Sequence, residues 1–256
     1  MRSWVEDFMR ALQFLTRLPA FWQVAWSQAA LGRSARLFPL IGALIGLLLA
    51  GLSWLLRQFP AAATLEHVTA AALVAAGIVI TGGLHCDGFM DTLDGVFSGR
   101  SREDMLKIMK DSRVGSFGAV GFALLILIRY SLLLDIKAPF MLAALFSAPV
   151  VARMAAVVAI YRFPYARSEG LGKMFNESAS GKNLGIALGL TVLLLAAAGP
   201  SAFCAGMISL LLSYAIACWF NKILGGLTGD VYGAVIEITE VLQLLLLVLL
   251  QQAFLD

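Results

Sequence analysis

The sequence predicts an all-α fold: a polytopic integral-membrane helical bundle with about seven transmembrane helices and an amphipathic interfacial helix at its N-terminal end. Of the 256 residues, 60% are hydrophobic and only 14% are charged, whereas a soluble globular chain has about 25% charged residues. Several apolar runs reach the roughly 20 residues with which a helix crosses a bilayer, and lysine and arginine gather in alternate connections between them. This composition excludes a disordered protein, a basic nucleic-acid-binding module and an ordinary cytosolic enzyme.

Residues 3–18 are predicted to form a helix that lies in the membrane interface. Apolar residues recur there at helical spacing, and Asp7 and Arg10 are among the polar residues on the other side. Pro19 ends the helix. A helix packed on the protein's own surface explains the pattern equally well. The segment lacks the short basic stretch, apolar core and cleavage site of a signal peptide, so we expect no leader to be removed.

Seven apolar segments follow, each predicted to span the bilayer. They are residues 37–56, 68–84, 117–134, 139–160, 184–199, 202–220 and 231–254. The second of them is short and rich in alanine and glycine, which suits a tilted or partly buried helix. Because the segments are evenly spread and no Pro-, Gly- or Ser-rich linker separates them, residues 1–256 are interpreted as a single integral-membrane catalytic domain.

The distribution of lysine and arginine predicts the orientation of the bundle. With the N-terminus inside, the inner segments hold most of the 19 lysines and arginines, whereas the outer connections hold only Arg57 and Lys137. An even number of spans would break this alternation. Residues 1–36 then form a cytoplasmic or interfacial N-terminal segment. The long connections 85–116 and 161–183 are also inner, so we expect the function at the cytoplasmic face.

The most informative stretch runs from His85 to Gly95 and reads HCDGFMDTLDG. Asp87, Asp91 and Asp94 are spaced i, i+4, i+7, which puts all three on one face of a helix. Like charges on one stripe repel, so such a stripe needs a compensating cation. Carboxylate oxygens are the ligands that Mg²⁺ prefers, and Mg²⁺ bridges them to substrate phosphates. The stretch therefore predicts a metal–diphosphate site, and the alternative is a solvated acidic helix face.

Further candidates lie in the same segment, which we interpret as a cytoplasmic acidic catalytic segment over 85–116. Lys110 and Arg113 offer two cations suited to phosphate oxygens, although positive charges here would also anchor the third span. Asp111 is a candidate further ligand or general base. His85 is a candidate base, metal ligand or partner of a substrate phosphate.

A second acidic cluster follows a turn rich in glycine and threonine before the last span. The turn, which includes Thr228, would present backbone N–H groups to an anion, and this signal is weak by itself. Asp230 and Glu237 share a helix face, and Glu240 lies roughly 60° further round. Because the two glutamates fall inside an apolar span, water or partners must reach them. Arg153, inside the fourth span, is a candidate partner for one of them in a buried ion pair.

Together these stretches resemble the adenosylcobinamide-GDP ribazoletransferase family, also called cobalamin (5′-phosphate) synthase. The matching segments keep the family's order over nearly the whole chain: 14–19 (FLTRLP), 38–42 (FPLIG), 82–95, 108–118 (IMKDSRVGSFG), 164–172 (PYARSEGLG) and 225–240. The HxDGxxDxxDG block is the most specific of them. Cys86 and Tyr232 stand where the family pattern leads us to expect aliphatic residues, and neither is a predicted ligand.

The resemblance implies the last assembly step of coenzyme B12, at the bacterial inner membrane, with the active site facing the cytoplasm. Adenosylcobinamide-GDP and α-ribazole (or its 5′-phosphate) would give adenosylcobalamin (or its 5′-phosphate) and GMP, with Mg²⁺ as cofactor. Phosphoryl transfer of this kind depends mainly on positioning and charge neutralisation. The expected partners are these two substrates, the lipid bilayer, and either further copies of the chain or other cobalamin-assembly enzymes, with no nucleic acid.

Residue roles follow from this chemistry. The predicted set is, for the metal, Asp87, Asp91 and Asp94; for proton transfer, Asp94, Asp111 and His85; and for substrate binding, Lys110, Arg113, Arg167, Thr228, Asp230, Glu237 and Glu240.

Three other classes stay open. A CDP-alcohol phosphotransferase shares the DxxDG core, and an aspartate-rich membrane prenyltransferase also uses Mg²⁺ on a diphosphate, so the metal site does not separate them. The 225–240 block and the KDSR segment favour the cobalamin enzyme. An ion-coupled transporter would line its pathway with Glu237, Glu240 and Arg153. Charge clusters on one membrane face, and the lack of broken helices in two related halves, count against it.

Overall fold

The computed structural model describes residues 2–20, 22–59 and 65–254. The regular elements of these residues are helices, and an isolated parallel bridge joins Tyr165 to Leu227. In chain order the helices are α1 (Arg2–Leu15), α2 (Gln28–Ala35), α3 (Phe38–Leu56), α4 (Glu66–Thr81), α5 (Leu84–Val96), α6 (Arg102–Ile108), α7 (Ser116–Asp135), α8 (Ala138–Arg162), α9 (Leu171–Glu177), α10 (Gly181–Ala198), α11 (Pro200–Leu224), α12 (Gly229–Leu250) and the 3₁₀ turn η2 (Gln251–Phe254).

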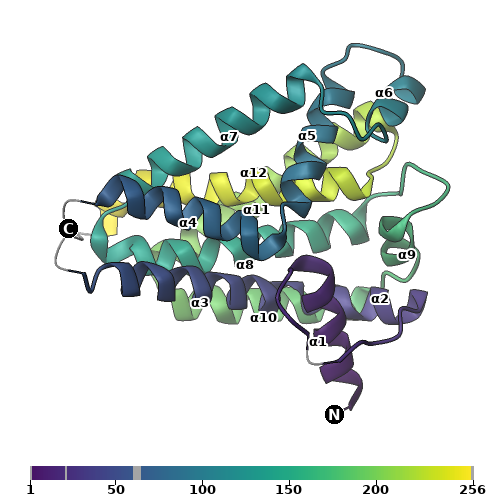
Figure 1. Ribbon diagram of the computed structural model, residues 1–256. Coiled ribbons are helices and arrows are strands. Elements are labelled where there is room, and N and C mark those ends of the chain that lie inside the picture. Colours follow the sequence, from purple (N-terminus) through teal and green to yellow (C-terminus); the bar gives the residue numbers. More distant parts are fainter. Residues whose placement is uncertain (1, 21, 60–64, 255–256) are drawn as a thin grey trace.

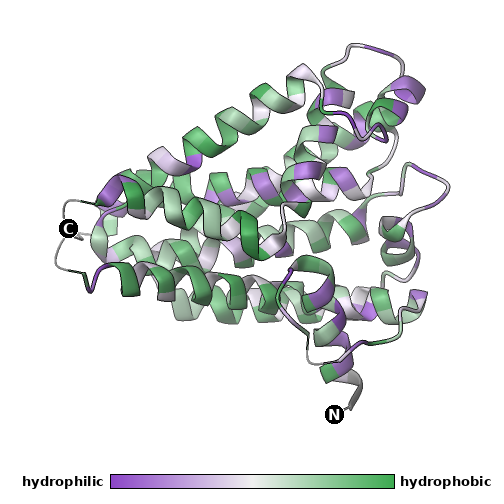
Figure 2. Cartoon of the chain, in the orientation of Figure 1, coloured by the Kyte–Doolittle hydropathy of each residue, from purple (hydrophilic) through white to green (hydrophobic). Residues whose placement is uncertain are grey.

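The long helices lie side by side along one direction (Figure 1). Within the described residues, six of them are long and apolar enough to cross a membrane: α3, α7, α8, α10, α11 and α12. The bent pair α4–α5 makes a seventh if it is counted as one span. Figure 2 shows apolar residues along these helices and many hydrophilic residues in the connections. The predicted fold class, a helical membrane bundle of about seven spans, is confirmed.

The core of the bundle forms around α8, which is the most buried of the candidate spans. Gly42 and Gly46 are four residues apart on α3 and face α8 across a close contact. A Cβ atom on Gly42 would clash with the carbonyl group of Pro149, and one on Gly46 would lie 2.7 Å from the Cα of Phe146. Small residues at this spacing let two helix backbones approach each other in a membrane.

A sharp bend separates α4 from α5. Gly82 and Gly83 have φ angles of 64° and 71°, in the left-handed region that glycine adopts readily, and the helix axis turns by 91°. The helix α5 then packs against α7 and α12 (Figure 1), and most of its residues are buried. The acidic motif is therefore part of the packed bundle, whereas the sequence analysis had placed it in an inner connection.

The N-terminal helix α1 packs on α2 and α3, as the alternative interpretation of this segment predicted. Asp7, expected on the polar side, is fully buried and forms ion pairs with Arg10 (2.8 Å), Arg36 (3.0 Å) and Arg33 (3.5 Å). Arg10 is buried as well. These two residues of the predicted polar side therefore lie inside the packed structure, where buried charges are stable because they compensate one another.

Several connections gather at one end of the bundle, which we call the loop-rich end. It comprises the segments 85–116, 161–183 and 225–230, together with α1 and α2, whereas the end of α12 lies at the opposite end (Figure 1). With α4 counted, consecutive long helices run in alternating directions. The prediction that the two long inner connections lie at the same end is confirmed, and that end carries most of the predicted site residues.

Candidate active site

The acidic motif of α5 crosses the start of α12 at the loop-rich end, and glycines make the crossing close. A Cβ atom on Gly88 would lie 2.8 Å from the carbonyl oxygen of Asp230, and one on Gly233 would lie 3.1 Å from the carbonyl oxygen of His85. Because neither residue has a side chain, the two backbones meet directly. The crossing places the carboxylates of α5 beside the first turn of α12.

Three aspartates form what we call the open carboxylate group: Asp87, Asp91 and Asp230. The charges of Asp87 and Asp230 both act on Asp91, and an Nη2–Oδ2 distance of 2.7 Å pairs Arg167 with Asp230. Among the described residues, no three His, Cys, Asp or Glu side chains converge closely enough to hold a metal ion by themselves. The group nevertheless fits Mg²⁺, which is bound by one or two carboxylates together with substrate phosphates.

Asp94 shares the face of Asp87 and Asp91 by register but has different surroundings. Its carboxylate accepts hydrogen bonds from the backbone N–H groups of Gly115 (2.7 Å) and Gly118 (2.8 Å). These donors belong to the first turn of α7, where backbone N–H groups lack helical partners. Asp94 therefore caps α7 from α5. Its roles as metal ligand and proton acceptor stay predictions.

Arg167 reaches the open carboxylate group because its loop is fixed to the turn before α12. The N–H of Ala166 donates to the carbonyl of Leu227, and the N–H of Leu227 donates to the carbonyl of Pro164, both at 2.8 Å. These bonds make the isolated bridge between the two segments. The predicted phosphate-binding arginine thus lies beside the predicted metal ligands, although 70 or more residues separate them in the chain.

Thr228 is buried at the N-terminus of α12. Its hydroxyl accepts a hydrogen bond from the N–H of Val231 and donates one to Asp230, both at 3.3 Å. It is the N-cap residue of the helix, a position where threonine satisfies an otherwise unpaired donor. Thr228 therefore orients Asp230, and direct contact of Thr228 with a substrate stays a prediction.

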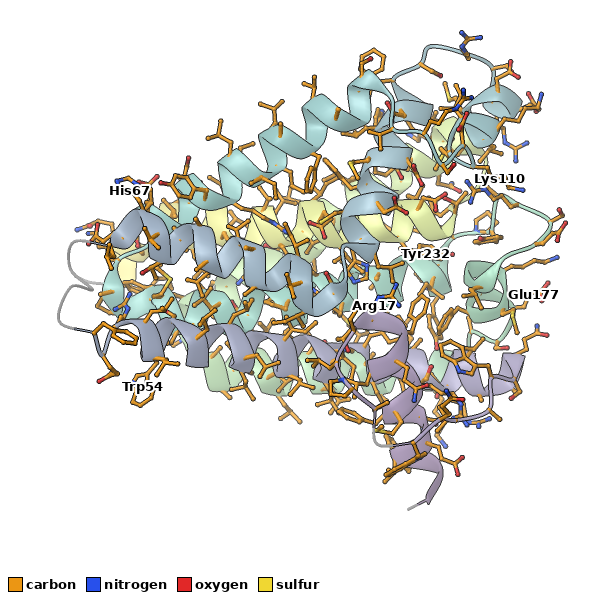
Figure 3. All side chains as sticks on the ribbon, in the orientation of Figure 1. Arg17, Trp54, His67, Lys110, Glu177 and Tyr232 are labelled. Carbon is orange, nitrogen blue, oxygen red and sulfur yellow. The ribbon has the colours of Figure 1, made fainter. Side chains whose placement is uncertain are left out.

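The predicted residues Lys110, Asp111 and Arg113 lie in the connection between α6 and α7. The Arg113 side chain is 87% exposed and pairs with Asp111 at 2.6 Å. These hydrogen bonds lower the pKa of Asp111 to about 2, so the carboxylate stays ionised at neutral pH. Lys110 is exposed at the outer edge of the loop-rich end (Figure 3). The side chain of Arg167 donates to the carbonyl of Met109 at 3.4 Å, which places this connection next to the site.

The two glutamates of α12 lie deeper in the bundle, in what we call the buried ion network: Arg129, Arg153, Glu237 and Glu240. Arg129 pairs with Glu237 at 2.8 Å and with Glu240 at 2.7 Å, and Arg153 pairs with Glu240. The predicted partnership of Arg153 with one of the glutamates is confirmed. Arg129 was missed, although its place inside a predicted span signals such a role. Substrate binding by the glutamates stays a prediction.

A cavity of about 280 Å³ opens beside the open carboxylate group, between α1, α3, α5, α8, α9 and α12. Its polar lining residues are His85, Asp87, Tyr165, Arg167, Asp230 and Tyr232. Phenylalanines at 14, 38 and 175 line it as well. None of the three is a predicted site residue, although the first two lie in matched motifs. Phe175 carries no local signal, because the packing of α9 against α2 and α8 brings its ring beside Phe14 and Phe38.

The fold and the site define a helical membrane protein with an acidic, arginine-containing cavity at one end of its bundle. Residues 7–248 match the family model described as cobalamin-5-phosphate synthase. The chain belongs to that family, and it is a transferase of cobalamin biosynthesis. The resemblance found from the motifs is confirmed.

Relatives named adenosylcobinamide-GDP ribazoletransferase match the chain over most of its length. The protein of Roseiflexus sp. (strain RS-1) is 39% identical, over 97% of this chain and 92% of its own length. The protein of Desulfitobacterium hafniense (strain Y51) is 37% identical, over 92% and 93%. The protein of Escherichia coli (strain K12) is 36% identical, over 94% and 98%. No solved structure matches the chain.

Proposed function

We propose that the protein transfers the adenosylcobinamide phosphate group from adenosylcobinamide-GDP to α-ribazole or its 5′-phosphate. In this reaction a ribose hydroxyl oxygen of the acceptor forms a bond to the cobinamide-side phosphorus. The bond from that phosphorus to the bridging oxygen breaks, and GMP leaves. The observation that carries the proposal is that Arg167 pairs with Asp230 and acts, with Asp87, on Asp91, in a chain whose relatives are named ribazoletransferases.

Mg²⁺ is the cofactor of this proposal, and Asp87 and Asp91 would hold it, with Asp230 beside them. When bound there, the ion would neutralise charge on the diphosphate oxygens. Arg167 supports the same task from the protein's side, because a guanidinium held against Asp230 at 2.7 Å keeps further donors available for phosphate oxygens. Lys110 and Arg113 would add positive charge at the entrance to the site.

The proton of the attacking hydroxyl needs an acceptor, and His85 is the best supported of the three candidates. Its imidazole is buried, its Nε2 finds no partner among the described residues, and it lines the cavity. Asp94 already accepts two backbone hydrogen bonds. Asp111 is held ionised by Arg113 and has a pKa of about 2, which makes it a weak base.

We place the loop-rich end on the cytoplasmic side of the bacterial inner membrane. The lysines and arginines of the connections 85–116 and 161–183 support this orientation, because cytoplasmic loops carry an excess of both residues. GMP would then be released into the cytoplasm, and both substrates would reach the site without crossing the bilayer.

The test uses purified protein in detergent or liposomes with adenosylcobinamide-GDP, α-ribazole and Mg²⁺. We expect GMP and adenosylcobalamin in equal amounts, and neither product when EDTA replaces Mg²⁺. A parallel reaction with a CDP-alcohol donor examines the nearest alternative class, for which CMP would be released. Absence of GMP in the first mixture, or release of CMP in the second, would contradict the proposal.

A further inference from the structure

We propose that the cavity beside the open carboxylate group is the binding site of the acceptor nucleoside. Its aromatic base would lie against the phenylalanines, and its ribose would lie at His85 and Tyr232. The inference rests on the proposed function and adds to it the place of one substrate. It also states which part of the donor must lie elsewhere.

The first observation is the aromatic wall of the cavity, formed by Phe14, Phe38 and Phe175. The ring centroids lie 4.9 Å apart for Phe14 and Phe175, 5.6 Å for Phe38 and Phe175, and 5.9 Å for Phe14 and Phe38. The rings come from α1, α3 and α9, three separate parts of the chain. At these separations the three rings pack on one another. Phe38 and Phe175 are each only 1% exposed, so Phe14, which is partly exposed, is the ring with surface left for a flat aromatic ligand.

The second observation is a pair of unsatisfied polar atoms in the same cavity. His85 Nε2 and Tyr232 Oη find no hydrogen-bond partner among the described residues, although the two residues are only 3% and 6% exposed. Buried polar groups are almost always hydrogen-bonded. A ligand with hydroxyl groups or a ring nitrogen would supply both partners, and an aromatic riboside carries both kinds of group.

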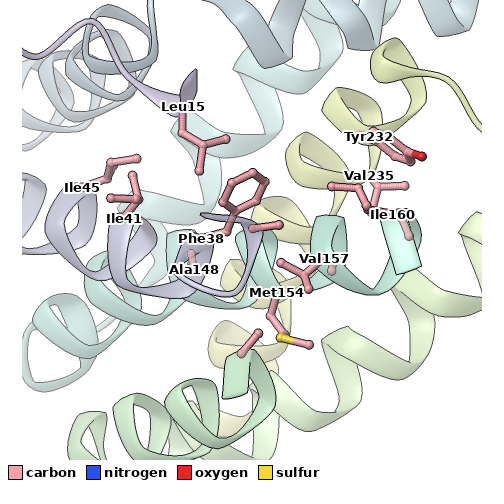
Figure 4. Close-up of a cluster of buried hydrophobic side chains, with 14 of the residues drawn as sticks. Leu15, Phe38, Ile41, Ile45, Ala148, Met154, Val157, Ile160, Tyr232 and Val235 are labelled. Carbon is pink, nitrogen blue, oxygen red and sulfur yellow. The ribbon is translucent and has the colours of Figure 1, made fainter. Parts of the chain in front are cut away.

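The cavity has both aromatic and charged lining residues, as an aromatic riboside has both an apolar base and a polar sugar. The lining of the cavity includes both the phenylalanines and the charged residues Asp87, Arg167 and Asp230. In the close-up of Figure 4, Leu15 and Phe38 lie apart from Tyr232, and all three line the cavity. A nucleoside with its base at the phenylalanines would extend its sugar toward the carboxylates, where the reacting hydroxyl is needed.

The chemistry of the wall favours this substrate over the two large parts of the donor. Guanine has donors and acceptors around its edge, and an apolar wall would leave them unpaired. The base of α-ribazole is a dimethylbenzimidazole, with an apolar edge and one free ring nitrogen. A cavity of about 280 Å³ is at the small end of ligand pockets, so the corrin macrocycle must lie outside it.

The test fills the cavity from an exposed position. Leu171 lines the cavity and is 50% exposed, so Leu171→Trp adds bulk without removing core packing. We expect the KM for α-ribazole to rise by about tenfold or more while the KM for adenosylcobinamide-GDP changes by less than about twofold. Leu142→Trp is the matched control, because Leu142 is 49% exposed on α8 and is not a lining residue of this cavity. Both constants should stay unchanged in it.

Calorimetric titration of α-ribazole into the protein, with no donor present, gives a second readout. Wild type and Leu142→Trp should bind, and Leu171→Trp should bind about tenfold more weakly or worse. A rise in the KM for the donor instead would place the donor in the cavity and overturn the inference. If wild type releases GMP but both KM values stay unchanged in Leu171→Trp, the inference fails and the proposed function stands. If wild type releases no GMP, both fail.

A further variant changes the wall itself. Phe14→Leu keeps the position apolar but removes the ring, and we expect it to raise the KM for α-ribazole with little change in kcat. Phe140→Ala, a buried phenylalanine at the other end of α8, controls for lost packing. An effect on kcat alone, or an equal effect on both substrates, would contradict a base-binding wall.

Discussion

Two groups of carboxylates, one where α5 crosses the start of α12 and one about two turns further along α12, have opposite surroundings. The open carboxylate group has three aspartates, is paired with a single arginine in the part of the chain that the structure describes, and borders a cavity. The buried ion network has two glutamates and two arginines, and its charges balance inside the bundle. A surplus of negative charge next to space for a ligand suits the binding of a cation and phosphates. A balanced network in a low-dielectric interior suits the joining of helices.

This difference predicts opposite outcomes for similar substitutions. Neutralising a carboxylate of the open group should remove activity and leave stability intact, whereas neutralising one in the network should remove stability first.

The largest effect on catalysis is expected from Asp91→Asn. GMP release should fall by more than about 100-fold, because the change removes a proposed metal ligand. Even mutation of groups that only hydrogen-bond to a metal ligand lowers metal affinity or activity by about 10–100-fold. The melting temperature should not fall, since the substitution relieves repulsion from the neighbouring aspartates. Glu103→Gln, in an exposed part of the same end, is the control of equal charge change and should behave as wild type. Near-normal GMP release from Asp91→Asn would refute the assignment.

The largest effect on stability is expected from Glu240→Gln. It would leave Arg153 without its ion-pair partner and Arg129 with Glu237 alone. The network would then carry one uncompensated buried positive charge, at a cost of about 3–5 kcal/mol, seen as a lower melting temperature in detergent. Adding Arg153→Met to the same chain should restore part of the loss, because removing a whole buried pair costs less than breaking it. A double variant less stable than Glu240→Gln would contradict a mutually compensating pair.

An intermediate effect is expected from Gly118→Ala. The added Cβ atom would clash with the carboxylate of Asp94 and separate α5 from α7, at a cost of about 1–3 kcal/mol. Turnover should fall with it, because α5 carries two of the proposed metal ligands. Gly185→Ala is the control, since a Cβ there meets nothing within 4 Å and alanine favours the helix. Equal melting temperatures for the two variants would show that Asp94 does not hold α7.

Smaller effects are expected in the exposed connection between α6 and α7. Lys110→Ala should raise the KM for adenosylcobinamide-GDP by less than about tenfold and leave kcat nearly unchanged, because exposed charges act through screened, long-range attraction. The difference in this KM between Lys110→Ala and wild type should become smaller as the salt concentration is raised. A loss of kcat at every salt concentration would instead place Lys110 on the reacting phosphate.

The smallest effect is expected from Asp111→Asn on the pH profile of kcat. With a pKa of about 2, Asp111 stays ionised throughout the working range and has no proton to gain or lose there. The profile between about pH 6 and 9 should therefore keep its shape. A proton acceptor must be deprotonated to act, so its titration governs the acidic limb of the profile. If that limb were lost in this variant, Asp111 and not His85 would be the proton acceptor.

The features that sequence predicts correctly depend on local periodicity or on the cost of an isolated charge. The apolar spans and the shared face of Asp87 and Asp91 follow from helical spacing. The pairing of Arg153 follows because a charge inside a span needs a partner. None of these requires knowledge of how distant segments pack.

The remaining features depend on contacts between distant segments, which periodicity does not contain. Asp230 lies beside the aspartates of α5 because Gly88 lets the backbones of α5 and α12 touch. Arg167 lies there because hydrogen bonds join its loop to the turn before α12. Asp94 is bound by the first turn of α7, which depends on where that helix begins relative to α5. The position of Asp7 on the polar side of a helical pattern predicts a surface residue. In the structure Asp7 is instead surrounded by three arginines: Arg10 of α1, Arg33 of α2 and Arg36, the C-cap residue of α2.

The contrast between the two carboxylate groups is tested most directly by the Mg²⁺ dependence of GMP release in Asp87→Asn and Glu237→Gln, measured side by side with wild type. We predict that the Mg²⁺ concentration for half-maximal rate rises by about tenfold or more in Asp87→Asn and stays at the wild-type value in folded Glu237→Gln. An unchanged Mg²⁺ requirement in Asp87→Asn, or a raised one in Glu237→Gln, would contradict the assignment of catalysis to the open carboxylate group.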